Sequence, residues 1–126
     1  MSIELANRAA IGDLSPEVVA WMAEGMRRHL AGDDLEHAFG LDRATRLRER
    51  NRSLQEAARL LDTGEGVWHL AGRLEAAVRR YERRIKPQIA AGLATALAPV
   101  DAAIHAAFLT GCRVPTTRRN LSELIR

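Results

Sequence analysis

The sequence predicts an all-α protein, and three features support this prediction. Apolar residues make up 47% of the 126 positions but aromatic residues only 4%. β-Branched residues are sparse and strand-like alternation is absent. Residues typical of helix starts and stops also recur along the chain. The length fits a single helical domain, residues 1–126, large enough to bury a core without cross-links.

Short helices are expected in the first part of the chain. One covers about residues 3–10. Ser15-Pro16 then predicts the start of a longer helix, with serine as the N-cap and proline in the first turn. This helix should end near Ala31, because Gly32 suits a C-terminal cap. Residues 33–39 are expected to form one more short helix.

Two long helices, about 42–62 and 67–86, are expected to form an antiparallel helical hairpin at the centre of the protein. Asp42 is the predicted N-cap of the first, and a short glycine-containing turn reverses the chain. Apolar positions in both helices repeat at alternating spacings of four and three, as in coiled-coil packing. The shorter helices should pack on this hairpin. The seam positions are Leu47, Asn51, Leu54, Ala58 and Leu61 in the first helix, and Val67, Ala71, Leu74, Val78, Tyr81 and Ile85 in the second.

Three features are expected in the remainder of the chain. Pro87 should disturb the second long helix, after which residues 89–98 continue as helix. Another helix is expected over residues 100–110. Thr116 or Thr117 should then cap a short helix that ends near residue 125.

The second long helix carries the strongest candidate for a binding surface. The net charge is +3, and 18 of the 19 basic residues are arginines, which suit phosphate recognition. Arg79 and Lys86 have glutamates three or four residues away, whereas four arginines have none. Three of the four fall within about 40° on a helical wheel. Those three are Arg73, Arg80 and Arg84, and Arg83 is the fourth.

This basic ridge could contact nucleic-acid phosphates, an acidic protein surface, or only water. The first hairpin helix is a weaker candidate, because acids flank arginines such as Arg46 and Arg52. Arg118 and Arg119 lie at the start of the last predicted helix, where backbone N–H groups could also meet a phosphate. The alternative is that this helix simply docks on the core.

No catalytic, metal or cofactor motif is visible. There is no phosphate-binding loop, dinucleotide fingerprint or paired-carboxylate arrangement, so a non-enzymatic protein without cofactor is expected. His29, Asp33 and His37 have metal-ligand spacing, but Gly32 should break the helix between them. His105 is expected to be exposed.

Cys112 is the only cysteine, so no internal disulfide can form and a reducing, cytoplasmic location is expected. No apolar run approaches the about 18 residues of a membrane span.

Three segments resemble small helical proteins encoded in prophages and mobile elements of GC-rich proteobacteria. The segments are "GDDLEHAFGLDRATRLRERNRSLQEAARLLD", "AGRLEAAVRRYERR" and "AAFLTGCRVPTTRRNLSEL". The resemblance implies a phage-type regulator or assembly factor. It brings no catalytic or binding motif, so it assigns no site.

The sequence therefore predicts a nucleic-acid-associated regulatory or accessory protein that contacts double-stranded DNA. A protein–protein adaptor or phage structural component, binding an acidic protein surface, is the alternative. A homodimer is also expected, because heptad seams are often shared between chains.

Overall fold

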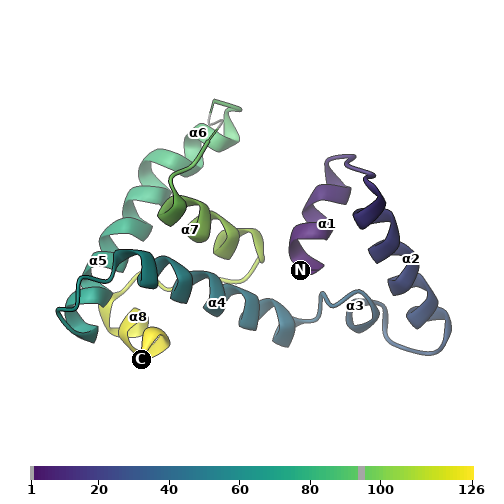
Figure 1. Ribbon diagram of the computed structural model, residues 1–126, viewed down its shortest axis with the longest axis horizontal. Helices are drawn as coiled ribbons and strands as arrows, with labels where there is room; N and C mark the ends of the chain where they lie inside the picture. The colour runs from purple at the N-terminus through teal and green to yellow at the C-terminus, as the bar shows by residue number, and fades with distance from the viewer. Residues whose placement is uncertain (1, 94–95) are drawn as a thin grey trace. The chain divides into compact units, whose positions relative to one another are not determined.

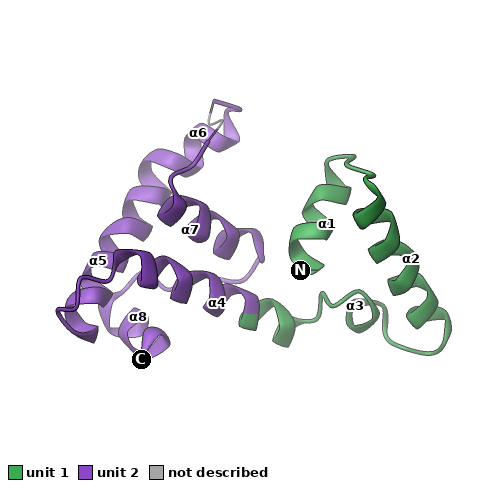
Figure 2. Ribbon diagram, viewed as in Figure 1, with its two compact units in different colours: residues 1–48 green, residues 49–126 purple. Residues whose placement is uncertain are grey.

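A computed structural model describes residues 2–93 and 96–126, and these residues contain helices and turns but no strand (Figure 1). The all-α prediction is therefore confirmed. The chain divides into two compact units, residues 1–48 and 49–126 (Figure 2). That the chain folds as a single domain stays a prediction.

The first unit is built around α2 (Pro16–Leu30), which contacts both α1 (Ser2–Ala10) and α3 (Leu35–Ala38). The expected helix positions are confirmed. Gly25 permits the close contact with the segment after α3, because a Cβ at this position would lie 2.5 Å from the Phe39 ring. The edge of that ring also packs on Trp21, with ring centroids 5.3 Å apart.

Ser15 precedes α2 as predicted, but it does not cap the helix with its side chain. Its hydroxyl instead accepts a hydrogen bond from Arg8 Nη2 at 2.8 Å. The same guanidinium binds the Asp13 and Glu17 carboxylates. Arg8 thus fastens the end of α1 to the start of α2.

The second unit contains most of α4 (Arg43–Leu61) and all of α5 (Val67–Arg80), η1 (Tyr81–Ile85), α6 (Lys86–Ala90), α7 (Pro99–Leu109) and α8 (Arg118–Ile125). The predicted Asp42 cap is confirmed, because Asp42 Oδ2 accepts from the backbone N–H of Thr45 at 3.2 Å. Thr117 likewise caps α8, accepting from the backbone N–H of Asn120 at 3.3 Å. These helices share one buried cluster: Leu54, Ala57, Ala58, Ala71, Leu74, Val78, Tyr81, Ile104, Ala107, Val114 and Leu121.

The long antiparallel hairpin is not confirmed. Leu54 and Leu74 are fully buried in one core, as the seams predicted. However, α4 and α5 leave the turn between them in different directions (Figure 1), and the close helical partner of α5 is α8. Leu121 of α8 belongs to the same buried cluster, and α8 packs closely on α5. Periodicity identified most of the buried face, although the seam position Val67 is 42% exposed, but it did not identify the helix that covers this face.

Pro87 changes the helix before it rather than ending it. Proline has no N–H to donate, and its ring clashes with the carbonyl four residues earlier. The chain responds with the π-helical turn η1, in which the Lys86 N–H donates to the Tyr81 carbonyl, five residues back. The helix then continues to Ala90 and is followed by a turn with Gly92, which has φ of +73°. The predicted helix over 89–98 is therefore too long, although its residues 94–95 lie outside the described residues.

Candidate nucleic-acid interface

The two units differ in charge. Residues 49–126 hold 13 of the 19 basic and 8 of the 16 acidic side chains, a net charge of +5. Residues 1–48 hold 6 basic and 8 acidic side chains, a net charge of −2. An excess of positive charge on one unit attracts polyanions to that unit. An anion-binding surface is therefore expected on the second unit.

Arg80, which the sequence placed in the basic ridge, is not free. Its Nη2 atom lies 2.6 Å from Asp101 Oδ1 of α7. Asp101 is only 7% exposed, so this ion pair neutralises a carboxylate that burial would otherwise destabilise. A helical wheel shows only residues of the same helix. It could therefore not identify Asp101, which lies 21 residues beyond Arg80.

Three arginines of the predicted ridge remain available: Arg73, Arg83 and Arg84. All three are exposed, and none forms a hydrogen bond or ion pair with the residues that the structure describes. The wheel that grouped Arg84 with Arg73 does not apply beyond Arg80, because η1 has a wider turn than an α-helix. The three arginines lie along the continuous helix formed by α5 and η1, residues 67–85, which we call the α5–η1 rod. The regular spacing behind the predicted single ridge does not hold beyond Arg80.

Arg118 has a structural role. Its guanidinium stacks on the Trp68 ring at 4.4 Å, and its Nε donates to the Trp68 carbonyl at 2.9 Å. Its backbone N–H donates to Glu75 Oε2 at 2.6 Å. Gly72 provides the space, because a Cβ there would lie 2.8 Å from Arg118 Cζ. Arg119, in contrast, is exposed, and its side chain has no partner among the described residues.

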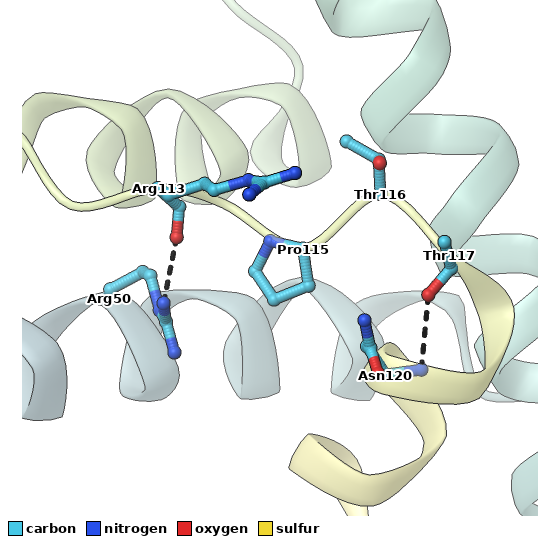
Figure 3. Close-up of a pocket in the computed structure, with 6 residues that line it drawn as sticks. All are labelled: Arg50, Arg113, Pro115, Thr116, Thr117 and Asn120. Atoms are coloured by element: carbon cyan, nitrogen blue, oxygen red, sulfur yellow. Dashed lines mark hydrogen bonds between the residues drawn. The ribbon is translucent and has the colours of Figure 1, made fainter.

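An open pocket of about 300 Å³ lies between α4 and the start of α8 (Figure 3). Arg50 Nη1 donates to the Arg113 backbone carbonyl at 2.7 Å and closes one side. The Arg113 side chain extends over Pro115, is exposed, and has no partner in the described part of the chain. The sequence patterns did not point to Arg113, because it lies outside every predicted helix. The lining residues are Arg50, Arg113, Pro115, Thr116, Thr117 and Asn120.

His105 is half-buried, so the prediction of an exposed histidine is wrong. The Tyr81 hydroxyl lies 2.7 Å from His105 Nδ1, and the Tyr81 ring stacks on Phe108 with centroids 4.8 Å apart. Burial lowers the pKa of His105 below its usual value and raises that of Tyr81. The Nδ1 atom of a neutral His105 can accept a hydrogen bond from the Tyr81 hydroxyl, which a protonated imidazole cannot do.

The buried His105 should make stability depend on pH. Its pKa is lowered on folding, so the unfolded chain binds the proton more readily. The contribution of His105 is complete above its unfolded pKa of about 6.5 and is lost as pH falls toward the folded pKa. Urea unfolding at pH 7.5 and pH 5.5 should show a smaller pH difference for His105→Gln than for the wild type. An identical difference in both proteins would contradict this.

His29, one of the three residues with metal-ligand spacing, contacts the backbone just after its own helix. His29 Nδ1 lies 2.9 Å from the Asp33 backbone carbonyl, so the ring contacts the turn that follows α2. Within residues 2–93 and 96–126, no group of three or more histidine, cysteine or acidic side chains is placed to hold a metal ion. In the same residues, no helix combines the length and apolar character needed to cross a membrane.

Comparisons with protein-family models, with curated proteins and with solved structures gave no significant match.

Proposed function

We propose that this protein is a non-enzymatic, nucleic-acid-associated accessory or regulatory factor that contacts duplex phosphates through its second unit. The observation that carries the proposal is a set of exposed arginines that have no partner among the described residues, in a unit of net charge +5. They are Arg73, Arg83 and Arg84 on the α5–η1 rod, and Arg113 and Arg119 near the start of α8. The resemblance to prophage-encoded proteins favours a regulator of phage type.

Phosphate contact fits these side chains better than base recognition. An arginine guanidinium binds phosphate oxygens with two parallel hydrogen bonds. Stacking of single-stranded bases needs open aromatic faces, whereas Arg118 already stacks on the Trp68 ring and Tyr81 is buried. The proposal is therefore for sequence-independent duplex contact, in which affinity depends on charge.

The salt dependence of duplex binding tests this proposal. Three phosphate contacts by Arg73, Arg83 and Arg84 give a slope of log affinity against log salt near −2.7 per chain, at about −0.9 per phosphate. Contacts by Arg113 and Arg119 would make it steeper. The measurement is fluorescence anisotropy of labelled duplexes of two unrelated sequences, which should give similar slopes. Absence of binding at about 50 mM salt would contradict the proposal.

The second candidate function is a protein–protein adaptor or phage assembly component. The same unpaired arginines fit an acidic protein surface, where they would pair with carboxylates. If the protein does not bind duplex DNA but forms a stable complex with an acidic protein, this alternative is favoured.

A further inference from the structure

The open pocket between α4 and the start of α8 has a positively charged lining. Its lining residues include two arginines, Arg50 and Arg113, and no aspartate or glutamate. Arg50 donates only to neutral acceptors, and Arg113 has no side-chain partner within the described ranges 2–93 and 96–126. Positive charges without nearby acids raise the local concentration of anions, so the pocket favours an anionic ligand.

Arg50 is held in a fixed position in the wall of this pocket. Its Nε and Nη2 atoms donate to Asn51 Oδ1 at 3.0 and 2.7 Å, and its Nη1 atom donates to the Arg113 backbone carbonyl at 2.7 Å. These bonds position the guanidinium without neutralising its charge. One N–H on each Nη atom remains for a ligand. Because Arg50 is half-buried, a bound anion would also stabilise its partly desolvated charge.

The segment that carries Arg113 is also fixed at its backbone. Val114 is buried in the core cluster, and the ring of Pro115 restricts the backbone over which the Arg113 side chain extends (Figure 3). Thr117 accepts from the backbone N–H of Asn120 at 3.3 Å and keeps its own O–H to donate. The backbone of this wall is therefore in place before a ligand binds, which lowers the cost of binding.

We propose that this pocket binds the phosphate group of a phosphate monoester. Such a group carries a charge of about −1.5 to −2 near pH 7 and has three acceptor oxygens, which match the two guanidiniums and the neighbouring hydroxyl and amide donors. A carboxylate or an internal phosphodiester carries only one negative charge. The lining has no aromatic side chain on which a base stacks, and about 300 Å³ is at the small end of ligand pockets. The pocket therefore recognises the phosphate rather than the molecule attached to it.

This inference goes beyond the proposed function, because it does not require that the protein bind duplex DNA. The phosphate comes either from the 5′ end of a nucleic-acid strand or from a free phosphate ester. The chemistry of the site is the same for both sources.

A nuclear magnetic resonance titration of the full chain at constant ionic strength tests the proposal. The probes are thymidine 5′-monophosphate and inorganic phosphate, and thymidine is the control that lacks the phosphate. Both phosphates should shift the backbone amide signals of residues 113–120, whereas thymidine should not. Equal shifts with thymidine, or a Kd weaker than about 10 mM for both phosphates, would overturn the proposal.

Three variants locate the site. Arg113→Gln removes an exposed guanidinium and should weaken the binding of thymidine 5′-monophosphate about tenfold. Arg79→Gln is the matched control, since Arg79 is an exposed arginine of the same unit that does not line the pocket, and it should leave the affinity unchanged. Asn120→Asp places a negative charge in the lining and should also weaken binding, although an acid in the first turn stabilises α8. Equal losses from Arg113→Gln and Arg79→Gln, or an unchanged affinity in Asn120→Asp, would contradict the site.

Duplexes with and without a 5′-phosphate distinguish the two sources. Tighter binding of the phosphorylated duplex that is lost in Arg113→Gln supports the pocket with the end of a nucleic-acid strand as its ligand. Equal binding of both duplexes, with binding of thymidine 5′-monophosphate intact, supports the pocket with a free phosphate ester as its ligand. The titration with small phosphates needs no duplex. Absence of duplex binding therefore contradicts only the proposed function, and absence of phosphate binding contradicts only this inference.

Discussion

Replacing Leu74 with alanine should lower the free energy of unfolding by about 2–5 kcal/mol. Leu74 is fully buried in the cluster that joins α4, α5, α7 and α8. Truncation removes apolar contacts and leaves a cavity that rigid neighbouring helices fill only in part. Leu54→Ala should have an effect of similar size, because Leu54 is equally buried. Urea unfolding followed by circular dichroism measures both.

The control for these variants is Leu60→Ala in the same helix as Leu54. Leu60 is 40% exposed, so its truncation removes less buried area than truncation of Leu54 and should cost less than the core values. Equal losses for Leu60→Ala and Leu54→Ala would contradict the core described here.

Replacing Arg80 with alanine should destabilise the protein by about 1–3 kcal/mol, because it leaves a buried acceptor without its partner. Asp101 is 7% exposed, and Arg80 Nη2 lies 2.6 Å from its carboxylate. The Arg80 side chain is itself 51% exposed, so water can reach the pair. The expected loss is therefore below the about 3–5 kcal/mol found when a fully buried pair is broken.

Arg79 provides a matched control one residue away. Its side chain is 53% exposed, similar to that of Arg80, and its carboxylate partner Glu75 lies 3.9 Å away. An exposed pair of this kind is worth about 0–1 kcal/mol, so Arg79→Ala should cost much less than Arg80→Ala. Equal losses would show that the contact with Asp101 has no special role.

The sequence predicted local features of the fold well. Ser15-Pro16, Asp42 and Thr117 each precede a helix at the expected place, because caps and proline act within one turn. The burial of Leu54 and Leu74 followed from apolar spacing alone. The packing of α8 on α5 did not, because Leu121 joins the core from 47 residues beyond Leu74, outside the reach of any single-helix pattern.

The same holds for the candidate site: contacts within one helix could be predicted from the sequence, but contacts between helices could not. Counting acids three and four residues away correctly left Arg73, Arg83 and Arg84 without partners. It missed Asp101 as the partner of Arg80 and Trp68 as the contact of Arg118, since both depend on tertiary packing. It also assumed a regular helix through Arg84, whereas Pro87 imposes a wider turn over residues 81–85.

The most direct test of the proposed function compares two triple variants that each remove three positive charges. One is Arg73→Gln/Arg83→Gln/Arg84→Gln, which removes the unpaired arginines of the α5–η1 rod. The other is Arg27→Gln/Arg28→Gln/Arg59→Gln, which removes exposed arginines bound to Glu24 or Glu56. We expect the first variant to flatten the duplex-binding salt slope by about 2.7 and to weaken binding to all sequences alike, and the second to change the slope little. Equal weakening by both would show that binding follows net charge alone and would contradict the assigned surface.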